Sequence, residues 1–433
     1  MQITLRKQVG SPNFFKDGDT IMASGSDMRV SQRTWKTRSA AIRAGRYIAL
    51  SLALLVASCQ SSNLGIDKEL DPQLNAPVLT PNPNGEVFGQ GQVRVSLLVP
   101  KSAPGNAATV ANEIRNGALL AIQDFGQNIV QLVIKDTQGQ AASAQAAANE
   151  AVLEGSTAIL GPVFSANVSA ASAVTLPAGR TMFAYSTDSS VARRGVYLLS
   201  FTPQDDTQRI ITYVISQGKR SILAFLPNNA EGSLRESTLR QIAGQTGAIV
   251  QIIKYDRSGP SIEQAVTSAA TFLPTVDSIY IPEGGEIPNV IMQTARKQGL
   301  KTIGKLIIGS GTWESVKVTE PQLDGAVYPG RDTANFANFA SRYETIYGSK
   351  PSVWAALGYD SVTLVTDLTQ RLGAKEGFTT AQIENPRGFS GINGIFRLRE
   401  NGTAERGLAI YQVVNGETRI VSPAPTSFSR TGS

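Results

Sequence analysis

Residues 93–125, VRVSLLVPKSAPGNAATVANEIRNGALLAIQDF, decide the fold of the chain. A short apolar run rich in β-branched residues, 93–99, predicts a buried strand. After a polar loop at 100–106, apolar residues recur at helical spacing at Val110, Ile114, Ala118, Ile122 and Phe125. Strand, loop and helix in this order predict parallel strands joined by crossover helices.

The same alternation continues along the chain. Further strands are predicted at 129–134, 158–160 and 181–185, and then at 221–226, 249–255, 278–281 and 305–308. Helices are predicted between them at 140–153, 167–176, 233–246, 261–273 and 286–298. Two wound sheets in series predict an α/β protein of two lobes facing a cleft. Ligands bind such sheets at the carboxyl ends of the strands.

The final third predicts a return to both lobes. Two helices are predicted at 335–347 and 352–372, and two strands at 394–398 and 407–414. Asn401-Gly402 is a hairpin-type turn signal between these strands. Because long helices and a closing hairpin need existing sheets to pack on, the chain is expected to return to the first lobe and then to the second.

The N-terminal region is typical of an export signal. Cys59 is the only cysteine, and it ends the run LALLVASC at 52–59, after a basic patch with Arg38, Arg43 and Arg46. The apolar stretch 47–56 is too short to span a bilayer but suits a signal peptide. The pattern resembles a bacterial lipoprotein signal, which predicts a signal region at 1–58 and a lipidated Cys59; Met28 is an alternative start. A buried apolar cysteine is the alternative interpretation.

A proline-rich segment follows the cysteine. Residues 59–92 hold Pro72, Pro77, Pro81 and Pro83 and have little apolar periodicity, so they predict a flexible tether. The signal region holds nine of the 40 basic and three of the 34 acidic side chains, so the remaining chain has 31 of each. This neutral balance gives no support for nucleic-acid binding.

The composition argues against catalysis. Histidine is absent and the one thiol is assigned to the anchor, so His/Cys metal clusters and Ser-His or Cys-His pairs cannot form. No Gly-x-Ser-x-Gly elbow is found. The sequence predicts a binding protein that is not an enzyme and uses no metal or cofactor.

Several short stretches in a fixed order carry a family resemblance: IRNGA at 114–118, Asp136, ILGP at 159–162, AALGYDS at 355–361, FSGING at 389–394 and YQVVNG at 411–416. Together they resemble the Leu/Ile/Val-binding family of solute-binding proteins. The resemblance implies the two-lobe type I periplasmic-binding fold, each lobe a doubly wound parallel sheet, with three hinge crossings. It places the first lobe at 93–205 plus 331–386, the second at 206–330 plus 387–422, and a tail at 423–433.

Residues of the first lobe are expected to bind a ligand carboxylate. Ser165 lies at a predicted helix N-terminus, where backbone N–H groups suit an anion, and the matching serine in the family contacts the ligand. Ser186 and Thr187 follow a strand where the family supplies further carboxylate contacts, and Tyr185 ends that strand. The alternatives are a helix cap at Ser165, an ordinary loop at 186–187 and a core position for Tyr185.

Charged residues complete the candidate site. Glu283 falls where the family places an acidic partner for a ligand ammonium group, and Lys101 at the first cleft loop favours an anionic ligand or an acidic partner surface. Either side chain is alternatively a solvated loop charge. Asn228 and Asn229 stand where the family often has an aromatic residue, which departs from a branched-chain amino-acid pocket.

Two functions remain open. The first is a membrane-anchored periplasmic lipoprotein that binds a small polar, amino-acid-like ligand between its lobes for an ABC-type importer. The second follows from a resemblance to lipoprotein activators of penicillin-binding proteins in alphaproteobacteria, through the lipoprotein start, the tether and the tail with Glu405-Arg406-Gly407-Leu408. In that case the chain contacts a cell-wall synthase and its cleft is vestigial or altered.

Overall fold

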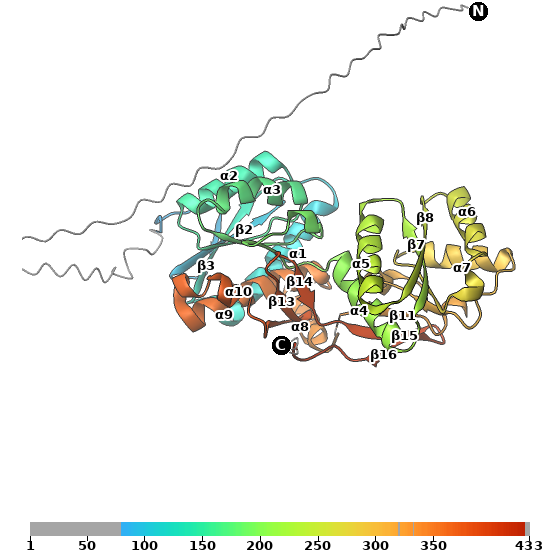
Figure 1. Cartoon of the computed structure of the whole chain (residues 1–433). Helices are drawn as coiled ribbons and strands as arrows, with labels where there is room; N and C mark the ends of the chain where they lie inside the picture. The colour runs from blue at the N-terminus through green and yellow to red at the C-terminus, as the bar shows by residue number, and fades with distance from the viewer. Residues whose placement is uncertain (1–78, 319–320, 332, 429–433) are drawn as a thin grey trace, which may run out of the picture. The chain divides into compact units, whose positions relative to one another are not determined.

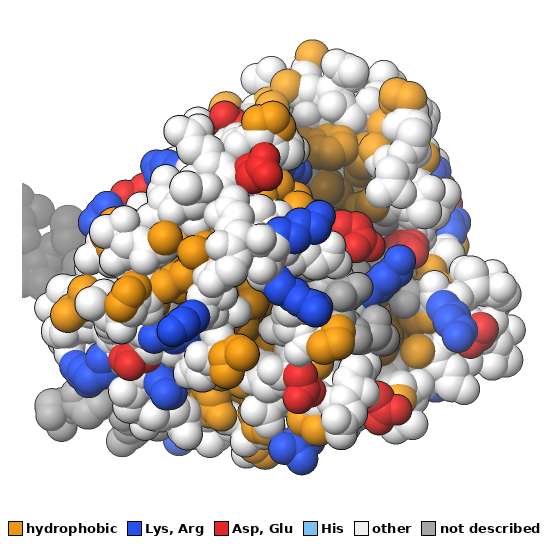
Figure 2. Space-filling view, turned by 90° about the vertical axis from the view of Figure 1, so that its right-hand side faces the viewer, with side chains coloured by type: hydrophobic (Ala, Val, Ile, Leu, Met, Phe, Trp, Pro, Cys, Tyr) orange, Lys and Arg blue, Asp and Glu red, His pale blue; other side chains and the backbone are white. Residues whose placement is uncertain are grey.

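The computed structural model describes residues 79–318, 321–331 and 333–428 (Figure 1). The predicted signal region, Met28 and Cys59 lie outside the described residues. No described helix has the length and apolar character needed to cross a membrane. Basic and acidic side chains are interspersed on the face shown in Figure 2.

The first lobe is built on a six-stranded sheet among the described residues, in the order β1-β3-β2-β4-β5-β6. Its strands are β1 (Glu86–Phe88), β2 (Val93–Val99), β3 (Val130–Asp136), β4 (Ala158–Leu160), β5 (Thr181–Ala184) and β6 (Val196–Leu198). Strands β2 to β6 are parallel, and β1 pairs antiparallel with β3. Strand β2 is buried along its whole length, as expected for a central strand covered on both faces.

Helices cover both faces of this sheet. They are α1 (Asn106–Ala121), α2 (Ala141–Leu153), α3 (Ser165–Thr175), α8 (Thr333–Tyr347), α9 (Val353–Glu376) and the short α10 (Thr380–Ile383), and a π-helical turn at Ile122–Gly126 continues α1. Apolar side chains of α1 and α9 share one core, while those of α2 and α3 form a second core on the opposite face. Figure 1 shows these two pairs on opposite sides of β2 and β3.

Two glycines set the distance between α1 and α9. A Cβ atom on Gly117 would lie 1.8 Å from the carbonyl oxygen of Ala355, and one on Gly358 would lie 2.1 Å from that of Ile114. Since neither contact leaves room for a side chain, the helices can pack this closely only with glycine at both positions. The short motifs around residues 117 and 358 therefore have a packing role.

The second lobe is built on a seven-stranded sheet within the described residues, in the order β16-β15-β11-β10-β9-β7-β8. Its strands are β7 (Ser221–Pro227), β8 (Ile249–Tyr255), β9 (Ser278–Tyr280), β10 (Leu306–Ile308), β11 (Val327–Gly330), β15 (Ala409–Val414) and β16 (Glu417–Ser422). Strands β7 to β11 are parallel, and β15 and β16 are antiparallel to their neighbours.

This sheet also has helices on both faces. Helices α4 (Pro203–Ser216) and α5 (Ala230–Thr246) pack on one side, and α6 (Gly259–Ala269) and α7 (Ile287–Lys297) on the other (Figure 1). Short 3₁₀ turns lie in this lobe at η4 (Leu273–Thr275), η5 (Gly311–Ser315) and η6 (Pro321–Leu323), and in the first lobe between β5 and β6 at η3 (Ser189–Val191). The predicted α/β two-lobe architecture is confirmed, although both sheets are mixed rather than wholly parallel.

A small third sheet follows the last helix of the first lobe in the sequence and precedes the last two strands of the second lobe. It consists of β12 (Phe389–Gly391), β13 (Gly394–Leu398) and β14 (Ala404–Arg406), and the side chains of Phe396 and Leu398 belong to the α1/α9 core. The turn at 401–402 joins β13 to β14. The predicted hairpin partner at 407–414 is instead β15, which pairs with β11 and β16. The described chain thus passes three times between the lobes, after β6, β11 and β14.

Several elements lie where the sequence predicted none, among them β1 and α4. Strand β1 falls within the range assigned to the tether, and the buried Arg94 side chain donates to the Thr80 carbonyl oxygen at 2.7 Å. Helix α4 occupies a gap between predicted strands. The predicted lobe boundaries stay a proposal.

Candidate functional site

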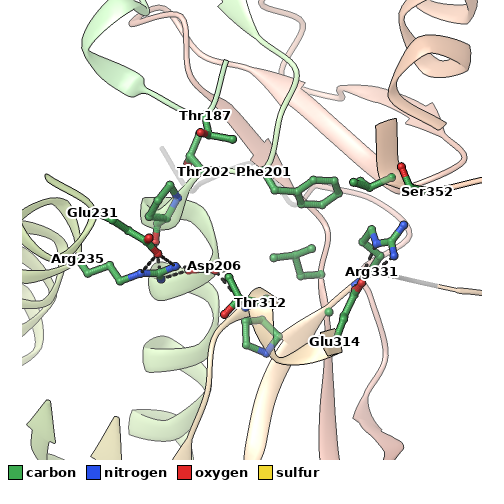
Figure 3. Close-up of a pocket in the computed structure, with 16 residues that line it drawn as sticks. Thr187, Phe201, Thr202, Asp206, Glu231, Arg235, Thr312, Glu314, Arg331 and Ser352 are labelled. Carbon is green, nitrogen blue, oxygen red and sulfur yellow. Dashed lines mark hydrogen bonds and ion pairs between the residues drawn. The ribbon is translucent and has the colours of Figure 1, made fainter. Parts of the chain in front are cut away.

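A cavity of about 520 Å³ is lined by residues of both lobes (Figure 3). Helices α4 and α5, turn η5 and the end of β11 contribute from the second lobe; Thr187 and the start of α9 contribute from the first. Figure 3 shows Glu231, Arg235 and Asp206 on one side of the cavity and Glu314 and Arg331 on the other.

Arg235 is the centre of a buried network on the α4/α5 side. Its guanidinium group donates to Asp206 at 2.5 Å, to Glu231 at 2.9 Å, to the Thr207 hydroxyl at 2.9 Å and to the Tyr280 hydroxyl at 3.0 Å. Burial alone would lower the pKa of Arg235, but the charge of Asp206 raises it above its ordinary value. This wall of the cavity is held by a guanidinium group whose charge is permanent and fully paired.

Arg331 and Glu314 form the facing charged pair. Arg331 Nη2 donates to Glu314 Oε2 at 2.7 Å and Nε donates to Oε1 at 3.2 Å, while Nη1 donates to Asn393 at 3.3 Å. The Arg331 guanidinium carbon also lies 4.9 Å from the centre of the Phe336 ring. These contacts fix the end of β11 next to the crossing that follows it.

Three hydroxyl groups of the cavity donate hydrogen bonds to other groups of the protein. Thr202 Oγ1 donates to Asp205 Oδ2 at 2.6 Å, and Ser352 Oγ donates to Glu113. Thr312 Oγ1 donates to the Pro282 carbonyl oxygen at 2.9 Å. Apolar contacts come from Phe201, Pro203, Pro329, Val353 and Leu408. The site can therefore hold a small molecule with both polar and apolar parts.

The predicted carboxylate-binding residues occupy different environments. Thr187 is exposed and lines the cavity. Ser186 is buried, and its oxygen accepts from the Asp188 amide at 3.1 Å. Tyr185 is fully buried in the α1/α9 core, where its hydroxyl is 2.7 Å from that of Ser361. Burial raises the pKa of Tyr185 above its ordinary value.

Ser165 begins α3 and faces a carboxylate of the chain itself. Hydrogen bonds from the Ser190 hydroxyl, at 2.7 Å, and from the Ser190 amide hold the pKa of Asp188 below its ordinary value, and the Ser165 hydroxyl adds a smaller lowering effect. Ser165 does not line the cavity described above. Asp188 therefore holds an ionised carboxylate next to the predicted anion site.

The two predicted charged residues lie outside the cavity lining. Glu283 is buried, accepts from the Tyr255 hydroxyl and pairs with Arg257 at 2.5 Å. Lys101 pairs with Glu86 and lines a separate cavity of about 400 Å³ at the ends of β2 and β3. Whether Ser165, Ser186, Thr187, Tyr185, Glu283 or Lys101 contacts a solute stays a prediction.

The charged residues of the cavity were not predicted from the sequence, although one signal for them was present. Thr202-Pro203 followed by Asp205 and Asp206 combines a capping hydroxyl, a first-position proline and an acidic first turn, which together mark a helix start. Glu231 likewise lies in the first turn of α5. No cluster of three or more His, Cys, Asp or Glu side chains suited to a metal ion is found in the described parts of the chain.

Comparisons with known proteins agree with this geometry. The sequence pattern of a family described as periplasmic binding protein matches residues 92–418. No curated protein matches the chain. The chain therefore belongs to the periplasmic binding protein family. This is a family of binding proteins, which confirms the prediction that the chain is not an enzyme.

Solved structures of similar fold cover most of the chain. A leucine-binding protein from Thermotoga maritima is 20% identical with a TM-score of 0.54, over 76% of this chain and 98% of its own. A putative branched-chain amino acid ABC transporter protein from Rhodospirillum rubrum is 18% identical with a TM-score of 0.65, over 76% and 99%. A solute-binding protein from Rhodopseudomonas palustris, solved with 3,4-dihydroxybenzoic acid, is 19% identical with a TM-score of 0.55, over 78% and 98%.

Proposed function

We propose that this member of the periplasmic binding protein family captures a small polar, amino-acid-like solute in the cavity between α4, η5, β11 and α9 and delivers it to an ABC-type importer. The observation that carries the proposal is the cavity of about 520 Å³, which is lined by polar and apolar side chains of both lobes. The likeness to a leucine-binding protein and to ABC transporter components supports it.

The position of the cavity between the lobes couples solute binding to the conformation of the protein. Its walls come from both lobes, and three chain segments run between them. A solute that touches both walls therefore favours the conformation in which both contacts are made. A cavity of this size matches small-molecule sites in proteins, which commonly measure about 300–1,000 Å³.

A thermal-shift screen of the full-length protein against small polar solutes tests the proposal. At least one solute is expected to raise the unfolding temperature, because a ligand that binds only the folded state stabilises it. Thr187→Trp fills the cavity mouth from an exposed position and is expected to abolish that shift. Thr267→Trp, at an exposed position on α6, is the matched control and should keep it. A library that leaves the wild type unchanged would argue against solute binding.

We also propose that the chain is a periplasmic lipoprotein anchored through Cys59. The basic patch, the short apolar stretch and the small residues before the thiol support this anchor. Cys59→Ser is expected to move the protein from the membrane fraction to the soluble fraction and to remove labelling by a radioactive fatty acid. Persistent labelling of the variant would refute the anchor.

Asp188 favours a second candidate function, the activation of a penicillin-binding protein. Its ionised carboxylate lies next to Ser165, where the resemblance placed a ligand carboxylate. A cleft altered in this way suits a regulator that acts through protein contact. Deleting the gene separates the two functions: loss of solute uptake supports import, whereas reduced incorporation of labelled peptidoglycan precursors with normal uptake supports regulation.

A further inference from the structure

The cavity has an excess of carboxylate groups over guanidinium groups. Asp206, Glu231 and Glu314 line it together with Arg235 and Arg331, so its formal charge is negative. Arg235 and Arg331 expose 2% and 18% of their side chains, whereas Glu231 and Glu314 expose 34% and 37%. The charged atoms that a solute can reach are therefore mainly carboxylate oxygens.

The guanidinium donors are already paired inside the protein. Arg235 Nε donates to Glu231, Nη1 to Asp206 and Nη2 to both carboxylates. Arg331 gives Nε and Nη2 to Glu314 and Nη1 to Asn393. A solute carboxylate would have to replace these charge-assisted bonds rather than add to them.

The helix N-termini at the cavity are compensated in the same way. Asp205 and Asp206 lie in the first turn of α4, and Glu231 lies in the first turn of α5. At α9 the N-terminal cap Ser352 donates its proton to Glu113. Carboxylates at these positions complement the positive end of the helix dipole, which removes the attraction for an outside anion.

The remaining candidate anion site lies near Thr187, and a carboxylate of the chain itself already lies next to it. Asp188 accepts from the Ser190 hydroxyl at 2.7 Å, and the Ser165 hydroxyl at the start of α3 contributes to lowering the pKa of Asp188. A solute carboxylate placed there would meet a like charge. An acceptor is available on the α4/α5 side of the cavity, because Glu231 uses only Oε1 for Arg235, and its Oε2 has no partner among the described residues.

We infer that the solute bound in this cavity presents hydrogen-bond donors, foremost an ammonium group facing Glu231, and does not depend on a carboxylate for binding. The inference rests on the proposed solute-binding function and names the chemical class of the solute. It predicts selection for cationic or amide-bearing relatives of amino acids over organic acids.

Calorimetry with matched compounds tests this class. Leucine, glutamine and phenylalanine are each compared with the amino-acid amide, which keeps the ammonium group, and with the deaminated acid, which keeps the carboxylate. For every framework that binds, the amide is expected to bind within about tenfold of the amino acid or more tightly, and the deaminated acid at least about a hundredfold more weakly. The reverse order would overturn the inference.

Two variants on α5 test whether Glu231 is the residue that selects solutes with an ammonium group. Glu231→Gln keeps an oxygen for Arg235 but removes the charge, and is expected to weaken binding of the amide at least about tenfold, because hydrogen bonds to charged groups are the stronger ones. Glu236→Gln is the matched control, since Glu236 pairs with Arg240 and Lys254 and does not line the cavity. Equal affinity of the Glu231→Gln variant and the wild type for the amide would overturn the assignment to Glu231.

The results separate this inference from the proposed function. Preferred binding of the deaminated acids would leave solute binding intact and refute only the donor-bearing class. Absence of binding across the whole set, by protein that unfolds cooperatively, would refute the solute-binding function and with it the inference. Unchanged unfolding temperatures of both variants would show that their affinities report on the site.

Discussion

Two buried arginines, one in the cavity wall and one at the crossing between the lobes, are treated differently by the fold. Every guanidinium nitrogen of Arg235 has an acceptor. Arg406 in β14 is also buried, yet it donates only through Nη2, to the Leu199 carbonyl oxygen, and its Nε and Nη1 have no partner among the described residues. Hydrogen bonds therefore fix the guanidinium group of Arg235 in the cavity wall, whereas the guanidinium group of Arg406 at the crossing has only part of its hydrogen bonds made.

Aromatic rings and distant carboxyl groups stabilise the positive charge of Arg406 in place of hydrogen bonds. Its guanidinium carbon lies 4.3 Å from the ring centre of Phe201 and 5.1 Å from that of Phe396. Burial lowers the pKa of Arg406 to about 10, opposed by the charges of Asp360 and Asp205. Burial also raises the pKa of each of these carboxyl groups to about 6. The groups whose charge changes near neutral pH therefore lie at the crossing, whereas the charges of the cavity wall are fixed.

The largest effect is expected from Arg235→Met. Removing the guanidinium group leaves Asp206 buried without its partner, and breaking a buried ion pair in this way costs about 3–5 kcal/mol. Urea unfolding followed by circular dichroism measures the change. Arg240→Met is the control on the same helix, because Arg240 is exposed and its pair with Glu236 contributes less than about 1 kcal/mol. Equal losses for the two variants would remove the contrast.

A pH-dependent effect of intermediate size is expected at Asp360. Because its pKa in the folded protein is about 6, above the ordinary 3.8, the folded state binds the proton more tightly, and stability from this group is lost as the pH rises through about 6. The unfolding free energy of the wild type relative to Asp360→Asn should fall by on the order of 2 kcal/mol between pH 4 and 7. Asp367→Asn, at a partly exposed site on the same helix, should show no such trend.

The smallest effect is expected from Arg406→Met. Since two of its nitrogens already lack acceptors, the loss should be about 1–2 kcal/mol, below that of Arg235→Met. At pH 5 Asp205 and Asp360 are mostly protonated, so the loss there should be smaller than at pH 8, where removing Arg406 leaves the Asp360 charge without a cation and Asp205 paired with Arg399 alone. Urea unfolding at the two pH values measures this difference. A loss at pH 5 that equals or exceeds the loss at pH 8 would contradict the interpretation of the crossing.

The sequence predicted the layers of the fold better than the cavity. The strand at 93–99 and the helix after it follow from local periodicity, which is visible within a short stretch of sequence. The cavity joins segments near residues 202, 231, 312, 330 and 352, which no local pattern connects. Glu283 illustrates the limit: its partners Tyr255 and Arg257 come from the end of β8, and only the strand order of the sheet brings them beside it.

Hydrogen–deuterium exchange of the full-length protein, with and without a saturating solute from the screen, tests most directly whether the cavity is the binding site. If the solute binds in the cavity, exchange slows at residues 187–188, 201–206, 311–314, 329–331 and 352–353, which come from both lobes. Slower exchange confined to the separate cavity around Lys101 and Asp136, with these segments unchanged, would contradict it.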